Sequence, residues 1–232
     1  MTDSDISAKP SSQWYDIWMQ FRSHKGALIG GIVFILIIAA VSLGPLLWPY
    51  DPTYIDIRAR NQTPNWAHPF GTDQLGRDTL ARMMAGGQTS IAVGLTAMLL
   101  ALVVGSFIGV LAGFFKRLDN LLMRMTDLFL ALPLLPILLV MMLLFREVLN
   151  NAFGPEKGIF ILITVSIGIT SWMPTARIVR GDVLALKERE FVLAARSIGT
   201  SNTRLILRHI LPNVMSPIMV SATLGIANAI IT

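Results

Sequence analysis

Residues capable of catalytic or metal chemistry stand closest together in residues 68–87, HPFGTDQLGRDTLARMMAGG. Their types make three of them candidate metal ligands: His68, Asp73 and Asp78. Arg77 and Arg82 lie beside the two carboxylates, and the spacing matches no common ligand pattern for zinc or calcium. We therefore interpret the segment as a loop with tight turns rather than as a metal site.

The sequence also lacks the motifs that position a phosphate or a nucleophile. It contains no G-x-x-x-x-G-K-[ST] loop to cradle ATP, no H-E-x-x-H motif and no G-x-S-x-G elbow. Its three histidines are scattered, and the absence of cysteine excludes disulfides, thiolate metal sites and cysteine nucleophiles. We predict that the chain is not an enzyme and binds no cofactor or metal itself.

The most informative stretch is polar and strongly basic, with hydrophobic segments on both sides: residues 191–212, FVLAARSIGTSNTRLILRHILP. Helical spacing places four apolar residues of its first half on one face, Phe191, Ala194, Ala195 and Ile198. Gly199 follows at the point where a helix C-terminus favours φ > 0. Thr200 or Ser201 can then cap a second short helix.

That second helix is predicted to place Leu205, Ile206 and Ile210 opposite Arg204 and Arg208, and to stop at Pro212. The two halves form a helix–Gly–helix elbow outside the bilayer, whose apolar face can dock into a groove on another protein. The docking role is assigned to Phe191, Ala194, Ala195, Arg196, Gly199, Arg204, Arg208, Leu211 and Pro212. The competing interpretation is a solvated loop that only anchors two membrane helices.

Composition favours a membrane protein. Of 232 residues, 53% are hydrophobic and only 14% are charged, whereas soluble domains average about 25% charged residues. Lipid can solvate the long charge-free runs. The excess of 19 Lys and Arg over 14 Asp and Glu fits membrane topology better than nucleic-acid binding, because the basic residues stand between apolar runs.

Five spans are predicted, at residues 26–48, 89–115, 120–145, 159–179 and 213–232. The first gives about 34 Å of helix for a hydrocarbon core of about 30 Å, and it is too long for a signal peptide. Residues 49–87 form an outer segment, and residues 180–212 form a cytoplasmic coupling loop. Residues 1–25 precede the first span. Their stripe of Trp14, Ile17, Trp18 and Phe21 predicts an interfacial helix, with a partner-binding helix as the alternative.

Two further patterns concern helix packing. Small residues recur every four positions in the second span, at Ala97, Ala101, Gly105, Gly109 and Gly113, so this stripe is predicted to let another helix approach closely. Pro133 and Pro136 predict a kink or an unwound turn in the third span. Asp127, three residues after Arg124, is interpreted as a paired interface residue rather than a proton-relay site.

The distribution of basic residues predicts the orientation. With the N-terminus in the cytoplasm, thirteen of the 19 Lys and Arg residues fall in inside segments and six in outside segments. An excess of positive charge on the cytoplasmic side is the rule for membrane helices. The N-terminus and the basic elbow are therefore predicted inside.

The basic stretch resembles the "EAA" loop of ABC-importer membrane subunits: Glu-Ala-Ala, three residues, Gly, nine residues, then Ile-x-Leu-Pro. Five positions fall in register: Ala194, Ala195, Gly199, Leu211 and Pro212. Leu193 replaces the family's Glu, and His209 replaces its first Ile. The segment HPFGTDQLGRD, residues 68–78, resembles one typical of peptide and nickel permeases. Together the two resemblances cover most of the chain.

This resemblance implies an all-α, polytopic fold of the type I importer permease kind, with six spans, the sixth beyond Thr232. It implies a plasma (bacterial inner) membrane location among lipid, and no nucleic-acid partner. The implied partners are a second homologous permease, two ATPase subunits that bind ATP and Mg, and an external solute-binding protein. This chain looks like the second permease of such a pair.

In the implied mechanism, closure of the ATPases moves the elbows and alternates access to a cavity between the two permeases. The third and fifth spans are expected to contact the solute, which is a dipeptide, an oligopeptide, a peptide conjugate or a nickel chelate. A secondary transporter or channel is the alternative function, although such proteins usually carry ionisable groups within their spans. A membrane scaffold fits the spans but not the two motifs.

Overall fold

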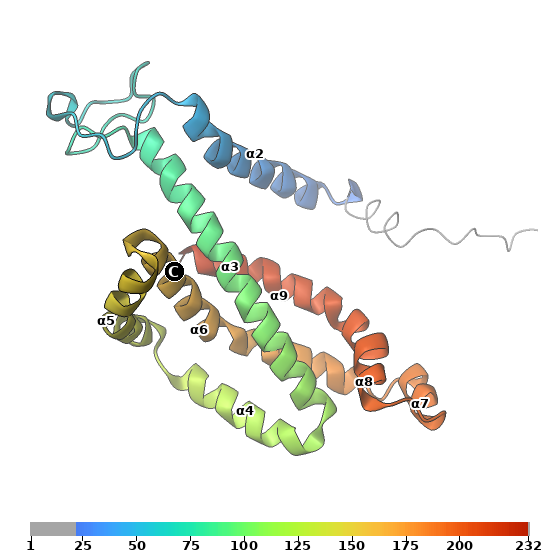
Figure 1. Ribbon diagram of the computed structural model, residues 1–232. Coiled ribbons are helices and arrows are strands. Elements are labelled where there is room, and N and C mark those ends of the chain that lie inside the picture. The colour runs from blue at the N-terminus through green and yellow to red at the C-terminus, as the bar shows by residue number, and fades with distance from the viewer. Residues whose placement is uncertain (1–21, 232) are drawn as a thin grey trace, which may run out of the picture. The chain divides into compact units, whose positions relative to one another are not determined.

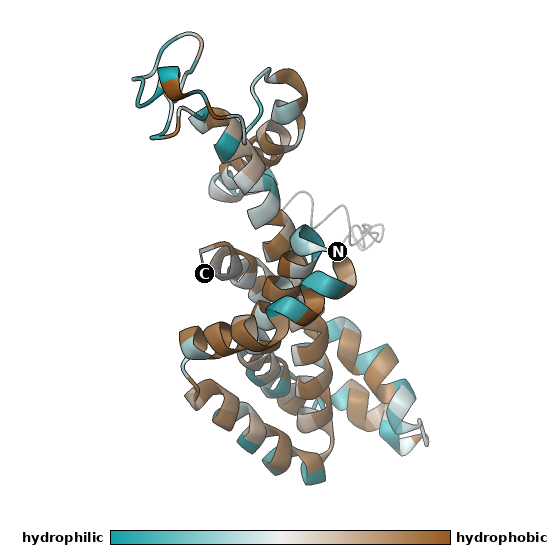
Figure 2. Cartoon of the chain, turned by 60° about the vertical axis from the view of Figure 1, so that its left-hand side comes forward, coloured by the Kyte–Doolittle hydropathy of each residue, from teal (hydrophilic) through white to brown (hydrophobic). Residues whose placement is uncertain are grey.

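The computed structural model describes residues 22–231, apart from the side chains of residues 228, 229 and 231. The predicted interfacial stripe of Trp14, Ile17, Trp18 and Phe21 lies outside the described residues. The chain divides into two compact units, Met1–Thr89 and Ser90–Thr232. Within residues 22–231, every named element is helical (Figure 1). Hydrophobic residues dominate the long helices, and hydrophilic ones gather in the connections (Figure 2).

The first unit contains α2 (Lys25–Leu47), an extended connection with the short helix η1 (Ile57–Ala59), and the start of α3 (Thr79–Phe114). Pro45 lies inside α2 and has no N–H to donate to the carbonyl of Val41. The side chain of Gln88 supplies the missing donor, with Nε2 3.0 Å from that carbonyl oxygen. This bond ties the beginning of α3 to α2.

The second unit is organised around α6 (Pro155–Leu186), which contacts α4 (Lys116–Ala131), α5 (Leu134–Phe153) and α9 (Leu211–Ile231). Three short elements connect α6 to α9: α7 (Glu190–Ser197), α8 (Asn202–Leu205) and the π-helical η2 (Ile206–Ile210). The part of α3 after Thr89 packs against α6 as well, because Met98 and Ala101 share a buried cluster with Met173 and Ala176.

Five described helices are long and apolar enough to cross a membrane: Lys25–Leu47, Thr79–Phe114, Leu134–Phe153, Pro155–Leu186 and Asn202–Ala227. The most apolar window of α3 and that of α6 are partly buried within the protein, whereas those of α2 and α5 hold no buried residue. The part of α5 that does not pack on α6 is therefore left for lipid or for a partner. The number of candidate spans agrees with the sequence, but their bounds differ.

The predicted third span at residues 120–145 is interrupted at the first of the two prolines from which the sequence predicted a kink or an unwound turn. Two helices occupy it, α4 and α5, and they are separated at Leu132 and Pro133. A residue before proline is driven into extended backbone by the proline ring, and Leu132 has φ −80° and ψ 132°. Pro136 lies in the first turn of α5, where a missing N–H costs little.

The other bounds shift because polar residues are helical beyond the apolar runs. α3 begins at Thr79, ten residues before the predicted start, since Asp78 caps it by accepting a hydrogen bond from the N–H of Ala81 at 2.7 Å. α6 continues to Leu186, so residues 180–186 of the predicted coupling loop are helical. Hydropathy finds the apolar part of a span and misses its polar helical ends.

The predicted stripe of small residues on α3 lies against α6. A Cβ atom added to Gly105 would lie 2.6 Å from the carbonyl oxygen of Trp172, and one added to Gly109 would lie 2.7 Å from that of Ala176. At Gly113 the nearest atom is Cβ of Val183, at 2.7 Å. Ala97 and Ala101 are fully buried. The two helices approach so closely that no larger side chain fits between them.

Candidate coupling elbow and membrane groove

The residues between α6 and α9 form the elbow that the sequence predicts, beginning with α7. Arg189 is the N-cap residue of α7 in extended backbone, Glu190 lies in its first turn and Arg196 in its last. This order of charges suits the helix dipole, which favours acidic groups at the N-terminus and basic groups at the C-terminus. The N–H of Val192 donates to the carbonyl of Arg189 at 3.0 Å and closes the first turn.

Gly199 reverses the chain after α7 and has φ +81°, as the sequence predicts. The N–H of Thr200 donates to the carbonyl of Ala195 at 3.1 Å, and the N–H of Gly199 donates to that of Arg196 at 3.0 Å. These two bonds form a Schellman motif, which satisfies the last carbonyls of the helix. No heavy atom outside residues 198–200 lies within 4 Å of a Cβ built on Gly199, so only the backbone conformation favours glycine here.

The second half of the elbow differs from the prediction. Ser201 is the N-cap residue of α8, but its side chain makes no capping hydrogen bond. Pro212 does not end the helix: Ile206 and Leu211 keep αR backbone, and α8, η2 and α9 run on without a break. Proline is tolerated in membrane helices when a local π adjustment re-satisfies the backbone, and η2 supplies that adjustment one turn before Pro212.

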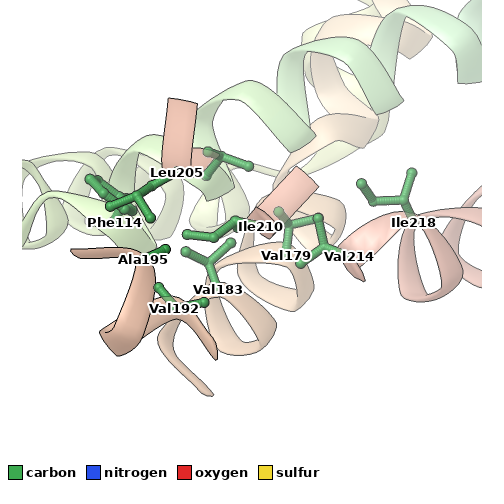
Figure 3. Close-up of a cluster of buried hydrophobic side chains, with 10 residues drawn as sticks. Phe114, Val179, Val183, Val192, Ala195, Leu205, Ile210, Val214 and Ile218 are labelled. Atoms are coloured by element: carbon green, nitrogen blue, oxygen red, sulfur yellow. The ribbon is translucent and has the colours of Figure 1, made fainter. Parts of the chain in front are cut away.

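The elbow is attached to the spans by one buried apolar cluster (Figure 3). Its members come from α3, α6, α7, α8, η2 and α9: Val110, Phe114, Val179, Val183, Val192, Ala195, Leu205, Ile210, Val214 and Ile218. Interiors of this kind are close-packed and transmit displacement. The cluster therefore joins α7 and α8 directly to the ends of α3, α6 and α9.

The structure separates the residues that the sequence placed on one docking face. Ala195 points into the buried cluster and is 8% exposed, whereas Phe191 is 44% exposed and Ile198 85% exposed. Ala195 therefore belongs to the protein's own core rather than to a surface shared with Phe191 and Ile198. Val192 is fully buried and was missed, although its spacing of three from Ala195 marks an inward stripe.

The outer surface of the elbow is both apolar and basic. Its exposed residues are Phe191, Leu193, Ala194, Arg196, Ile198, Arg204, Leu207, Arg208 and Pro212. Leu211 is only partly exposed, and Leu205 and Ile210 face inward opposite the arginines, as predicted. Arg196 lies 5.9 Å from the ring centre of Phe114, and Phe191 contacts the ring of His209.

Ion pairs hold the end of α6, just before the elbow, against α4. Arg180 donates to Asp119 through Nη2 at 2.7 Å as well as through Nε, and this bidentate pair lowers the pKa of Asp119 through the Arg180 hydrogen bonds. Arg177 pairs with Asp127. The sequence had set Asp127 beside Arg124 on its own helix. The observed partner instead comes from α6, which sequence spacing alone could not identify.

A groove of about 320 Å³ lies in the second unit between α6 and α9 and is bordered by α3. We call it the hydroxyl groove, because four of its lining residues carry hydroxyl groups. It is lined by Met98, Thr170, Ser171, Pro174, Thr175, Ile178, Ser221, Leu224 and Gly225. None of these residues is charged. Of the two spans that the sequence favoured for solute contact, the fifth contributes to the lining through α9, and the third contributes none of it.

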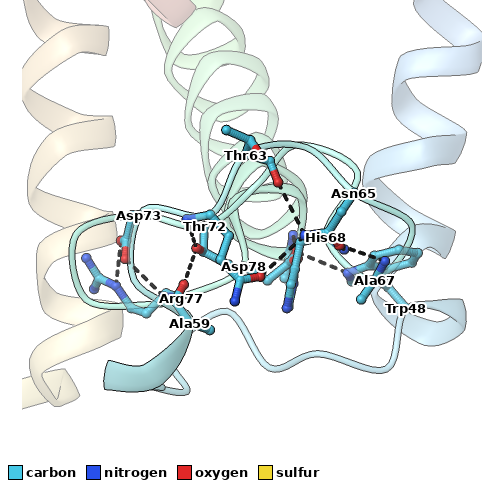
Figure 4. A network of polar contacts seen from close by, with 12 residues as sticks. Trp48, Ala59, Thr63, Asn65, Ala67, His68, Thr72, Asp73, Arg77 and Asp78 are labelled. Carbon is cyan, nitrogen blue, oxygen red and sulfur yellow. Dashed lines mark hydrogen bonds and ion pairs between the residues drawn. The ribbon is translucent and has the colours of Figure 1, made fainter.

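In the first unit, the HPFGTD segment folds into a compact loop held by a polar network around His68, Asp73 and Asp78 (Figure 4). Asp78 accepts hydrogen bonds from the indole of Trp48 at 3.0 Å and pairs with Nδ1 of His68 at 2.8 Å. Gly76 has φ +77°, and a Cβ there would lie 1.6 Å from the carbonyl oxygen of Asp56. Within residues 22–231, no three His, Cys, Asp or Glu side chains could hold a metal ion together.

Asp73 is the second carboxylate of this polar network. Its carboxylate accepts hydrogen bonds from the N–H groups of Leu75 at 2.8 Å and Arg77 at 3.0 Å, and from the Arg77 guanidinium at 2.8 Å. Burial raises the pKa of Asp73, but these hydrogen bonds outweigh it and bring the pKa from its ordinary 3.8 to about 2. The polar network therefore favours the ionised form of the Asp73 carboxyl group.

This lowered pKa predicts how the stability of the outer segment changes in acid. A carboxyl whose pKa is lower in the folded state stabilises the fold above its unfolded pKa of 3.8, and the contribution is lost as the pH falls towards about 2. Asp73→Asn is expected to be less stable than the wild type at neutral pH. This difference in stability is expected to shrink as the pH falls from 3.8 towards about 2. A fluorescent probe attached to the cysteine of Trp66→Cys would report the unfolding of the outer segment, residues 49–87. An unchanged difference at pH 2 would contradict the assignment.

Comparison with known proteins gives two family matches. Residues 101–232 match the family described as binding-protein-dependent transport system inner membrane component. Residues 12–64 match the N-terminal TM domain of oligopeptide transport permease C.

Individual relatives cover nearly the whole chain. It is 39% identical over 229 residues to the oligopeptide transport system permease protein OppC of Bacillus subtilis (strain 168), which covers 98% of this chain and 71% of the relative. It is 34% identical over 230 residues to the dipeptide transport system permease protein DppC of the same strain, covering 98% and 68%. A putative peptide permease protein of Brucella abortus biovar 1 (strain 9-941) is 38% identical over 213 residues, covering 91% and 67%.

Proposed function

The chain belongs to the family of inner membrane components of binding-protein-dependent transport systems, and we propose that it lines part of an ATP-driven path for peptides. Membership confirms the predicted class, a helical, multi-pass permease subunit of an ABC transport system and not an enzyme. The observation that carries the peptide assignment is the similarity, over 98% of the chain, to permeases named for oligopeptide and dipeptide transport.

The proposed partners follow from the surfaces that the chain leaves exposed. The basic and apolar outer surface of the elbow fits a cleft on each of two ATPase subunits, which bind ATP and Mg. The unburied face of α5 is available to lipid and to a second, homologous permease. In the proposed topology, a solute-loaded binding protein meets the outer segment, where Trp66 is fully exposed and Phe70 is 55% exposed.

In the proposed mechanism, the elbow carries movement of the ATPases to the spans. Val192 and Ala195 on the elbow share one packed cluster with Val179 and Val183 near the end of α6. The pair Arg180–Asp119 makes α4 move with α6. Nucleotide-driven closure of the ATPases therefore shifts α6 and α9, the two walls of the hydroxyl groove, and changes the side from which solute reaches it.

The function is tested by reconstitution. The complex of both permeases and both ATPases in proteoliposomes is expected to take up trialanine only with the binding protein outside and ATP inside. Uptake that persists without ATP but follows an ion gradient would favour the alternative, a secondary transporter. Trialanine uptake at the rate of empty liposomes would contradict the peptide assignment.

The proposed orientation places the N-terminus and the elbow in the cytoplasm and the HPFGTD segment outside, in accord with the division of thirteen to six basic residues. The chain has no cysteine, so single cysteines report sides without background. Trp66→Cys is expected to react with an impermeant maleimide from outside, and Ile198→Cys only after permeabilisation. Both residues are highly exposed, so burial cannot mask either. Labelling of both from one side would contradict the orientation.

A further inference from the structure

We infer that the hydroxyl groove binds the main-chain amides of a passing peptide and not its charged groups. This inference rests on the proposed function and assigns its peptide-contacting surface. The lining contains four hydroxyl groups and no ionisable side chain. A carboxylate terminus, an ammonium terminus or a chelated metal would gain no ionic partner here, whereas an amide requires only neutral donors and acceptors.

Ser171 is the residue best placed to bind an amide. Within the described part of the chain, its hydroxyl makes no hydrogen bond to protein, and its side chain is neither fully buried nor fully exposed. A polar group at membrane depth is costly unless it finds a partner or water. Ser171 borders a groove of about 320 Å³, which is roomy enough for water or for a short stretch of extended peptide.

The backbone of α6 adds an acceptor beside Ser171. Pro174 lies inside α6 and cannot donate an N–H to the carbonyl of Thr170, the residue four positions earlier. Both Thr170 and Pro174 line the groove. The hydroxyl of Thr170 donates to the carbonyls of Ser166 at 2.8 Å and Ile167 at 3.1 Å. The single hydrogen of the Thr170 hydroxyl is thus engaged. The carbonyl oxygen and the hydroxyl oxygen of Thr170 both remain acceptors for a peptide N–H.

The floor of the groove joins its two walls. The hydroxyls of Thr175 on α6 and Ser221 on α9 lie 2.9 Å apart, and both residues are buried. Gly225 on α9 leaves space for the side chain of Met98, since a Cβ there would lie 2.1 Å from the Met98 sulfur. The flexible thioether of Met98 can adapt to different side chains. The groove therefore combines fixed polar groups for the main chain with an adaptable apolar wall.

Access to the groove is tested with cysteine in the reconstituted complex. Ser171→Cys is expected to react with a charged, water-soluble thiosulfonate, and trialanine with binding protein and ATP is expected to slow that reaction several-fold. Leu143→Cys is the matched control: Leu143 lies on the exposed face of α5, and it is expected not to react. An unreactive Ser171→Cys, or a rate that peptide leaves unchanged, would overturn the inference.

Recognition of the main chain is tested with Ser171→Ala and two peptides, trialanine and its analogue methylated on both amide nitrogens. The Ser171 oxygen can accept a hydrogen bond from a peptide N–H, which the methylated analogue lacks. Loss of this bond is expected to lower the uptake of trialanine about three- to tenfold and to leave the uptake of the methylated analogue unchanged. The ratio of the two rates then falls towards one. Any preference of the binding protein for one of the two peptides affects wild type and variant equally, so it cancels when their uptake ratios are compared. An equal loss for both peptides would show that Ser171 accepts no hydrogen bond from a peptide N–H, and it would overturn the inference.

The two failures are distinguishable. If wild-type complex does not take up trialanine at all, the proposed function fails. If the wild type transports trialanine while Ser171→Cys is unprotected and Ser171→Ala keeps the wild-type ratio, only the groove assignment fails.

Discussion

Gly199→Val is expected to abolish solute-stimulated ATP hydrolysis while both permeases still insert and assemble. At φ +81°, a β-branched residue costs about 1–2 kcal/mol or more, and the chain relieves this strain by opening the Schellman turn between α7 and α8. Arg204 of α8, Arg208 of η2 and the apolar residues of α7 then no longer face one cleft together. The measurement is hydrolysis and trialanine uptake in proteoliposomes, alongside recovery of ATPase with the purified permeases.

Two controls separate backbone strain from bulk at Gly199. Gly199→Asn is expected to keep most of the activity, because asparagine tolerates left-handed backbone. Gly181→Val places the same side chain on α6, where a Cβ would meet no heavy atom within 4 Å and φ is not positive, and it is expected to remain active. Wild-type hydrolysis by Gly199→Val would mean that the elbow is a solvated loop without a role in coupling.

Gly109→Leu is expected to reduce the yield of assembled complex severely. A Cβ at this position would already lie 2.7 Å from the carbonyl oxygen of Ala176 and 2.8 Å from Cβ of Val179, so α3 and α6 must separate. Overpacking of this kind costs roughly 1–3 kcal/mol or more, and the separation also opens the cluster that holds the elbow. The measurement is the amount of monodisperse complex recovered per milligram of membrane.

The control for Gly109→Leu is Gly30→Leu on α2. Gly30 also lies in a candidate span, but a Cβ there would meet no heavy atom within 4 Å. This variant is expected to assemble as the wild type does, which excludes a general effect of leucine on insertion. Equal recovery of Gly109→Leu and the wild type would contradict the close approach of α3 to α6.

The sequence predicted the features that depend on local chemistry. The positive φ of Gly199 follows from the need to end one helix and start another within three residues, and the interruption at Pro133 follows from a missing N–H and a crowded preceding residue. The small residues of α3 repeat at a helical period, so their shared face was predictable as well. Each of these signals lies within a few residues of its structural effect.

The features that sequence reasoning missed depend on partners far apart in the chain. Ala195 was placed on the docking face because its own helix carries apolar residues on more than one side. Only the tertiary packing of Val183 and Leu205 shows which side is buried. Asp127 was paired with Arg124, yet Arg177 lies fifty positions away. The hydroxyl groove likewise requires α6 and α9 together.

The correction at Ala195 changes which variants test the coupling surface. Ala195→Asp would place an unpaired charge in the buried cluster of Val192 and Leu205, and it is expected to unfold the elbow rather than to block docking alone. Ile198 projects outward instead, so a substitution there reports on the partner and leaves the core intact.

The central claim, that the elbow docks on an ATPase, is tested most directly by cross-linking from Ile198. A benzophenone maleimide attached to Ile198→Cys in the assembled complex is expected to yield a covalent adduct with an ATPase subunit after illumination. The same reagent on Trp66→Cys, in the outer segment, is expected to yield none with that subunit. An ATPase adduct from residue 198 alone is the predicted result. Its absence from residue 198 in a complex that hydrolyses ATP, or its formation from residue 66, would contradict the account.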